Sequence, residues 1–215
     1  MAEAVAESPG NLLANPGFEA GREGWSYATD SEFWKDFEIV ESGARTGDGA
    51  AYLRLERDGS SPPKRVEVHG VVQELRPEPF PERLGGWYRV QRWEKDSERT
   101  ALYLQVVVVV MEGGSNYQIR YYLAGAPERA ISVSNAKVEI VSGDPPRQGA
   151  WVQFDLPIRR DFERLWGVVP SDYDSVRFLF EARWDKLRRD AEPALTATVY
   201  YDDLSVLAYD DAIDR

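Results

Sequence analysis

Cysteine is absent from this 215-residue sequence, and histidine occurs once, at His69. The absence of cysteine excludes disulfides, thiolate-ligated metals and a cysteine nucleophile. No apolar run approaches the roughly 20 residues that a membrane-spanning helix needs, and the longest, Val106 to Met111, has the length of one buried strand. The sequence also contains no glycine-rich phosphate loop, nucleophile elbow or metalloprotease motif. It therefore supports neither nucleotide chemistry nor hydrolysis by a catalytic triad.

Positive charge is also scarce. The 26 basic residues are outnumbered by 37 acidic ones, which gives a net charge of −11. Nucleic acids and anionic membrane surfaces bind proteins with a basic footprint, so we expect neither partner and no membrane insertion. Residues 1–10 contain neither a basic region nor an apolar stretch, unlike an intact signal peptide. We expect residues 1–10 to form a disordered leader and residues 210–215 to form an acidic tail.

Strand patterns dominate the rest of the chain. Segments with alternating apolar and polar residues, or with clustered valines and aromatics, are separated by turns rich in glycine, proline and asparagine. One short helix is expected at 159–166, with Gly167 as its stop. This pattern predicts an all-β, antiparallel sandwich with one short helix, in a single domain over residues 11–209. The expected strands are 37–40, 51–56, 65–75, 84–93, 100–111, 117–123, 129–142, 150–156, 176–184 and 196–207.

Three stretches carry a resemblance to a known family. Residues 11–19 read Asn-Leu-Leu-Ala-Asn-Pro-Gly-Phe-Glu, residues 42–49 read Ser-Gly-Ala-Arg-Thr-Gly-Asp-Gly, and residues 199–206 read Val-Tyr-Tyr-Asp-Asp-Leu-Ser-Val. In order and spacing they resemble the opening, the glycine-bearing turn and the closing strand of carbohydrate-binding modules of families four, nine and twenty-two. The resemblance implies a jelly roll of the galactose-binding-like type. It also implies a secreted or cell-surface location, with the signal peptide missing from this sequence.

The resemblance further implies a structural Ca²⁺ ion. In the family, the Glu of Gly-Phe-Glu and the first Asp of the closing pair supply carboxylates. These positions correspond to Glu19 and Asp202, with Asp48 nearby. Oxygen ligands from distant parts of a chain suit Ca²⁺, which binds six to eight oxygens in a flexible geometry. The alternative is that Asp202 and Asp203 are solvated acids beside a turn.

Polar and aromatic side chains alternate with core residues along several expected strands. Aromatic rings near glutamine and arginine suit sugars, which present apolar C–H faces and polar rims. If these strands share one sheet, the residues form a cleft for a glycan, and the arginines suit an acidic sugar. The alternative is that the residues simply face outward and that the tryptophans cover the core edge. The candidate ligand-binding residues are Trp87, Arg89, Gln91, Trp93, Tyr103, Gln105, Gln118, Arg120 and Tyr122, and the set extends to Gln73, Trp151, Gln153, Arg177, Glu181 and Arg183.

These observations predict a non-catalytic carbohydrate-binding module that holds a polysaccharide or surface glycan, alone or beside a larger secreted enzyme. One alternative is a structural or adhesive jelly roll without a sugar site. The other is a jelly-roll polysaccharide lyase in which His69, on the same strand side as Gln73, acts with tyrosines and arginines. The lyase patterns Arg-x-Glu-x-Arg and Gln-x-His are absent. No spacing selects two carboxylates, such as Glu67 and Glu181, for glycoside hydrolysis.

Overall fold

The computed structural model describes residues 10–27, 33–58, 66–77, 79–95, 100–126, 134–187 and 194–208. The expected acidic tail and all but the last residue of the expected leader lie outside these ranges. The described part contains eleven strands and one helix. They are β1 (Trp34–Lys35), β2 (Glu38–Val40), β3 (Ala50–Asp58), β4 (Val66–Leu75), β5 (Arg83–Lys95), β6 (Thr100–Glu112), β7 (Ser115–Ala124), β8 (Ala136–Ile140), β9 (Trp151–Leu156), α1 (Ile158–Trp166), β10 (Ser175–Lys186) and β11 (Ala194–Leu207).

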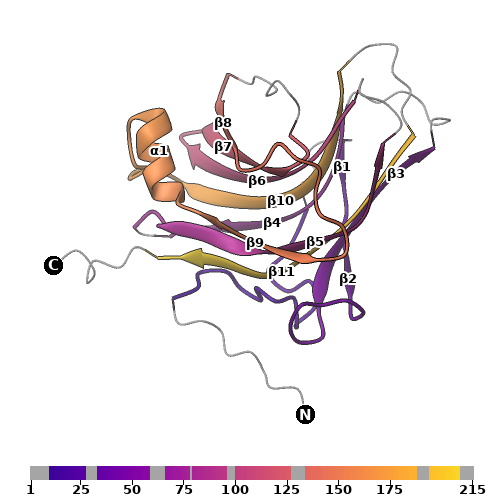
Figure 1. The fold of residues 1–215 in the computed structure, drawn as a ribbon. Helices are drawn as coiled ribbons and strands as arrows, with labels where there is room; N and C mark the ends of the chain where they lie inside the picture. The colour runs from indigo at the N-terminus through magenta and orange to yellow at the C-terminus, as the bar shows by residue number, and fades with distance from the viewer. Residues whose placement is uncertain are drawn as a thin grey trace.

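The strands form two sheets that pack face to face (Figure 1). The six-stranded sheet has the order β1-β4-β10-β6-β7-β8, and the five-stranded sheet has the order β2-β3-β11-β5-β9. Neighbouring strands are antiparallel except at the two edges of the six-stranded sheet, where β1 pairs with β4 and β7 with β8 in parallel. The predicted all-β jelly-roll sandwich with one short helix is therefore confirmed. Strand β1 was not predicted.

The core lies between the sheets. In β6, Val106, Val108 and Val110 belong to this core, whereas Val107 packs in a separate apolar cluster on the opposite side of the sheet. Val107 is only 3% exposed. Strand β6 lies between β10 and β7, so its predicted central position is confirmed. Its inner valines pack in the core between the sheets, whereas Val107 packs beside Val72 and Leu179 of the same sheet. A continuous valine run suits a strand that buries apolar side chains on both sides.

Helix α1 closes one end of the sandwich (Figure 1). Phe162 is fully buried, and its ring packs against Phe80 and Tyr117 at centroid distances of 5.1 and 5.9 Å. Gly167 ends the helix in a left-handed conformation, with φ at 76°, and its N–H donates to the carbonyl of Glu163. Glycine adopts this conformation without steric cost. Among the described residues, no helix is long and apolar enough to cross a membrane.

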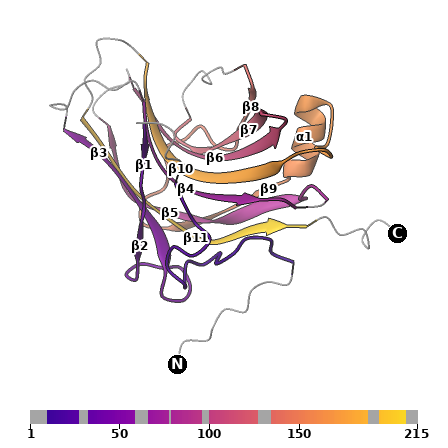
Figure 2. The ribbon, with the colours of Figure 1, turned by 180° about the vertical axis from the view of Figure 1, so that it is seen from behind.

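The opening segment runs beside the closing strand, as Figures 1 and 2 both show. Asn11 forms a bridge with Leu207, and its side chain donates to the carbonyl of Leu204 and accepts from the N–H of Val206. Farther along, the N–H of Leu204 donates to the carbonyl of Pro16. Phe18 then enters the core, 4.9 Å from the ring of Trp25. The first and the last of the three resembling stretches, residues 11–19 and 199–206, therefore lie side by side.

Candidate functional site

The predicted ligand-binding residues do not share one face. Trp87, Arg89, Gln91 and Trp93 lie on β5, in the five-stranded sheet, whereas Tyr103, Gln105, Gln118, Arg120 and Tyr122 lie on β6 and β7, in the six-stranded sheet. A single cleft formed by all nine is therefore wrong. The strand pattern predicted which residues alternate with the core, but not which strands are neighbours.

Trp93 also faces the opposite way from Trp87. The pairing of β5 with β11 skips Gln91, because Val90 opposes Val199 and Arg92 opposes Thr198. Such a bulge inserts one residue and reverses the alternation beyond it. Trp93 consequently packs against the core, with its ring beside Gly125. Its predicted place on the polar face is wrong for this reason.

On the outer face of the five-stranded sheet, arginines cover the aromatic rings. The guanidinium of Arg45 lies 3.9 Å from the ring centroid of Trp87, and that of Arg89 lies 4.4 Å from Tyr200 and 5.1 Å from Trp151. Cation–π contacts of this kind stabilise the face. They also occupy the ring surfaces on which a sugar would stack. Trp87 and Arg89 therefore form part of a packed outer layer.

The outer face of the six-stranded sheet holds a buried polar cluster. Register places Glu181 beside Gln105 and Arg183 beside Tyr103, and Gln105 beside Tyr122 on the next strand. Gln105 donates a hydrogen bond from its side-chain amide to Glu181. Figure 1 shows β6 and β10 curving side by side.

One end of this cluster is fully paired. Arg183 donates to both carboxylate oxygens of Asp185, at 2.8 and 2.9 Å, and the hydroxyl of Tyr103 donates to Asp185 at 2.5 Å. This bidentate geometry is the strongest that arginine forms with a carboxylate. It holds Arg183 in place at the end of the face.

The centre of the cluster is incompletely paired. Among the buried side-chain atoms without a hydrogen-bond partner in the described part of the chain are Oε1 of Gln105, an acceptor, and Nη1 of Arg120, a donor. Glu181 lies next to both, is 1% exposed, and has a pKa that burial raises above its usual value. Leaving a buried polar atom unpaired costs about 1–3 kcal/mol. The cluster therefore contains one donor and one acceptor whose hydrogen-bonding capacity is not met within the described part of the chain.

An aromatic ring flanks the same face. Trp34 of β1 packs against an apolar cluster of Val72, Val107 and Leu179, and its ring lies over Gly70. A Cβ on Gly70 would stand 3.3 Å from the Trp34 ring and 3.1 Å from Glu181. Trp34 is absent from the predicted site residues. An isolated glycine within the β4 pattern is the sequence signal of such a close approach.

Three polar residues of β4, Glu67, His69 and Gln73, face the interior of the sandwich, whereas Glu74 is exposed and pairs with Arg177. Gln73 is 4% exposed and exchanges two hydrogen bonds with the backbone of Ala14, at 2.8 and 3.0 Å. His69 contacts Glu67 at 3.1 Å, and Glu67 pairs with Arg57 of the facing sheet. The prediction that Gln73 and His69 share a face with Arg183 and Gln105 is therefore wrong. Gln73 anchors the opening segment instead.

Three carboxylates surround Gly17 in the opening turn. One oxygen each of Glu19, Asp202 and Asp203 lies 3.7 Å from the point where a Cβ would stand on Gly17. Glu19 accepts hydrogen bonds from the N–H groups of Asp48 and Gly49, at 2.8 and 3.2 Å. The opening segment, the glycine-bearing turn and the closing strand thus converge on these side chains.

Asp202 is the buried member of this group. It is fully buried and accepts from the N–H of Arg45 at 2.6 Å. Burial, together with the neighbouring charge of Asp203, raises the pKa of Asp202 to about 7. Within the described ranges, no group of three or more Asp, Glu or His side chains is arranged to hold a metal ion. Asp203 already pairs with the guanidinium of Arg45 at 2.6 Å. Glu19 and Asp202 still offer carboxylate oxygens of the kind that Ca²⁺ binds.

Comparison with known proteins identifies no matching family model and no matching curated protein. Several solved structures are similar. TmCBM61, solved in complex with beta-1,4-galactotriose, has 13% identity and a TM-score of 0.48, covering 93% of this chain and 99% of its own. The C-terminal family 22 carbohydrate-binding module of Clostridium thermocellum Xyn10B has 11% identity and a TM-score of 0.49, with coverage of 94% and 96%.

A third similar structure is the enzymatically active domain of tailspike protein 4 from bacteriophage CBA120. It has 10% identity and a TM-score of 0.47, and the match covers 93% of this chain but 21% of that one. Carbohydrate-binding modules are thus among the solved structures that this chain resembles. No ligand and no site residue is transferred from them.

Proposed function

We propose that this protein is a non-catalytic carbohydrate-binding module that holds a polysaccharide or surface glycan on the outer face of its six-stranded sheet. The observation that carries the proposal is the pair of unpaired buried atoms beside Glu181, the acceptor of Gln105 and the donor of Arg120. A sugar hydroxyl group both donates and accepts. Neighbouring hydroxyls of one ring would satisfy both atoms after a small movement of the Gln105 and Arg120 side chains, because the two atoms are themselves buried.

Trp34 supplies the apolar part of the proposed site. Its ring lies on the same side of the sheet as Glu181, beyond Gly70. Sugars bind where a flat apolar surface meets a few fixed polar groups. The polar groups here are held in place because Arg120 also donates from Nε to Gln118, at 3.0 Å.

The proposal that the module is non-catalytic rests on the distance between its acidic groups on this face. Glu181 and Asp185 stand four residues apart on one strand, which separates them by roughly 13 Å along it. Glycoside hydrolysis places its two carboxyl groups about 5–10 Å apart. His69, the base that a lyase would use, lies on the other side of the sheet.

A structural Ca²⁺ ion is part of the proposal. Glu19 and Asp202 would hold it, with Asp203 at the same place and carbonyl oxygens completing the shell. Its role would be to neutralise the facing carboxylates and fasten the opening segment to β11. The proposed setting is outside the cell, at the surface or beside a larger secreted enzyme, where polysaccharides are found.

Substitutions on the six-stranded sheet should weaken glycan binding, and a substitution on the five-stranded sheet should not. We expect retardation of the protein in gels that contain a bound polysaccharide, with Ca²⁺ present. Arg120→Ala and Trp34→Ala should each weaken binding about tenfold or more. Arg120→Ala removes a charge-assisted hydrogen bond, and Trp34→Ala removes the stacking surface. Trp87→Ala, on the opposite sheet, is the matched control and should bind like the parent.

The outcomes separate the alternatives. If no neutral or acidic polysaccharide retards the folded protein, the structural or adhesive jelly roll replaces this proposal. If Trp87→Ala loses binding while Arg120→Ala keeps it, the glycan binds the five-stranded sheet. Cleavage of a polysaccharide by the parent protein would contradict the non-catalytic role.

The pKa of Asp202 predicts how the stability of the metal-free protein depends on pH. A folded-state pKa near 7 exceeds the value in the unfolded chain, so the folded state binds the proton more tightly. The stabilisation is complete below the unfolded pKa and is lost as pH rises through about 7. With chelator present, the melting temperature should fall between pH 5.5 and pH 8. The fall should be smaller in Asp202→Asn, and an equal fall would contradict the assignment.

A further inference from the structure

The outer face of the five-stranded sheet carries an arginine that no carboxylate neutralises. Strand β5 contains three arginines. Arg83 pairs with Asp155 and Arg92 pairs with Glu94. Arg89, between them, forms no ion pair and no hydrogen bond with any residue within the described ranges. The central arginine of this strand therefore lacks the anion that the other two have.

The strand register explains why Arg89 has no acidic neighbour. Beside it in the sheet are Trp151 on β9 and Tyr200 on β11, and Tyr200 in turn lies beside Tyr52 on β3. The first carboxylate along this row is that of Glu38 on β2. It lies three strands away, or roughly 14 Å at the usual spacing between strands. At that distance Glu38 and Arg89 form no ion pair.

Aromatic rings hold the guanidinium of Arg89 in place. It lies 4.4 Å from the ring centroid of Tyr200 and 5.1 Å from that of Trp151. Gly43 leaves room for it, because a Cβ there would stand 2.4 Å from Nη2 of Arg89. Gly43 also has a φ of 102°, which only glycine adopts readily. The planar cation is therefore preorganised before any ligand binds.

The three nitrogens of this guanidinium differ in their access to a ligand. Nε is buried and has no hydrogen-bond partner within the described part of the chain. Nη1 and Nη2 also form no hydrogen bond there, but they are not among the buried unpaired atoms, so both reach the molecular surface. Two N–H groups side by side on a planar cation match the two oxygens of a carboxylate. The edge between Nη1 and Nη2 is therefore suited to a carboxylate that approaches from solvent.

We propose that Arg89 binds the carboxylate group of a small ligand, a simple carboxylate or an acidic sugar, on the outer face of the five-stranded sheet. The carboxylate would accept hydrogen bonds from Nη1 and Nη2, while the guanidinium keeps its contacts with Tyr200 and Trp151. Two rings that shield the pair from water strengthen its electrostatic attraction. The glycan site proposed above lies on the other sheet, so neither proposal depends on the other.

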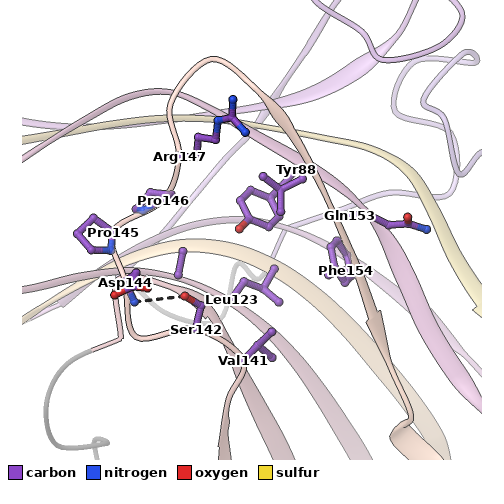
Figure 3. Close-up of a pocket in the computed structure, with 12 residues that line it drawn as sticks. Tyr88, Leu123, Val141, Ser142, Asp144, Pro145, Pro146, Arg147, Gln153 and Phe154 are labelled. Atoms are coloured by element: carbon purple, nitrogen blue, oxygen red, sulfur yellow. Dashed lines mark hydrogen bonds between the residues drawn. The ribbon is translucent and has the colours of Figure 1, made fainter.

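Arg147 is the natural comparison for Arg89. It lies on the loop beside the pocket that Tyr88, Pro146 and Phe154 line (Figure 3). Arg147 is exposed and has no carboxylate partner in the described ranges either. An exposed, unrestrained arginine loses side-chain entropy when it pairs, which leaves little net gain. We therefore expect no carboxylate binding at Arg147, which makes it the matched control.

The probes for this inference are acetate, methyl glucuronoside and the neutral methyl glucoside, titrated into the whole chain at constant ionic strength. Two-dimensional NMR spectra follow the Nε–H of Arg89 and the indole N–H of Trp151. Acetate and methyl glucuronoside should shift both signals saturably, and methyl glucoside should shift neither. Tighter binding of methyl glucuronoside than of acetate would identify an acidic sugar as the ligand, and equal binding would identify a simple carboxylate.

Variants of the two arginines locate the binding, with the Trp151 signal as the readout. Arg89→Gln should abolish acetate binding, and Arg89→Lys should weaken it about three- to tenfold because an ammonium lacks the planar fork. Arg147→Gln should bind acetate like the parent. Thermal melts show which variants fold, and Arg89→Lys, which keeps the charge over the rings, tests the contact even if Arg89→Gln unfolds. The inference is overturned if neither carboxylate shifts the Arg89 signal, if the folded Arg89 variants bind acetate as the parent does, or if methyl glucoside binds as tightly as methyl glucuronoside.

Discussion

Saturating Ca²⁺ should raise the melting temperature of this protein by about 5–10 °C. A ligand at 100 times its Kd stabilises the folded state by about 2.7 kcal/mol, and each kcal/mol shifts the midpoint of a domain of this size by about 2–4 °C. The physical source is the meeting of Glu19, Asp202 and Asp203 around Gly17. Thermal melts in Ca²⁺ and in chelator measure the effect directly.

Variants of the same acids locate the ion. Glu19→Gln and Asp202→Asn should each abolish most of the Ca²⁺-dependent rise, because each removes an anionic oxygen ligand. Glu23→Gln is the matched control, since Glu23 is an exposed acid of the same segment that lies outside the carboxylate group. Mg²⁺ should have a smaller effect because it demands near-octahedral geometry and releases water reluctantly. A melt that does not respond to Ca²⁺ would remove the ion from this protein.

The strands and the helix were largely predictable because they depend on local patterns. Alternation fixed β3, β4 and β9 to within two residues, and the valine run fixed β6 as a central strand. The expected strand at 129–142 corresponds only to β8 (Ala136–Ile140), and residues 129–133 lie outside the described ranges. Strand β1 was not predicted because its two residues are too few to show an alternation of apolar and polar side chains.

The grouping of the site residues was not predictable from the same patterns. Alternation tells which residues share one side of a strand, but sheet membership depends on pairing between distant strands. Trp87 and Gln105 belong to different sheets for that reason. A single unpaired residue, Gln91, was enough to turn Trp93 into the core. On β4, Gln73 was predicted to lie on the polar outer face. Its hydrogen bonds are to the backbone of Ala14, which is distant in the sequence, so the local pattern could not predict them.

Two carboxylates of the proposed Ca²⁺ site were nevertheless identified from the sequence. Glu19 and Asp202 came from the resemblance, and the structure places both beside Gly17. Their approach follows from backbone pairing between the two ends of the chain, such as the bond from Leu12 to Val206. Whether an ion binds there stays a prediction until the melts described above are measured.

Gly49→Ala should destabilise the protein by about 3 kcal/mol, at the upper end of what overpacking a core costs. A Cβ on Gly49 would stand 2.4 Å from the carbonyl oxygen of Phe18 and 2.7 Å from its carbonyl carbon. These are backbone atoms and cannot rotate away. Phe18 is held by its buried ring against Trp25 and by the bond from the N–H of Gly21 to its carbonyl.

Gly143→Ala is the matched control, because a Cβ there meets nothing within 4 Å. Urea unfolding should show a lower midpoint for Gly49→Ala and an unchanged one for Gly143→Ala. Displacing Phe18 also moves Glu19, the next residue, so Gly49→Ala should weaken the response to Ca²⁺ as well. If Gly49→Ala unfolds like the parent, the close approach of the glycine-bearing turn to the opening segment is wrong. The geometry of the proposed ion site would then be wrong with it.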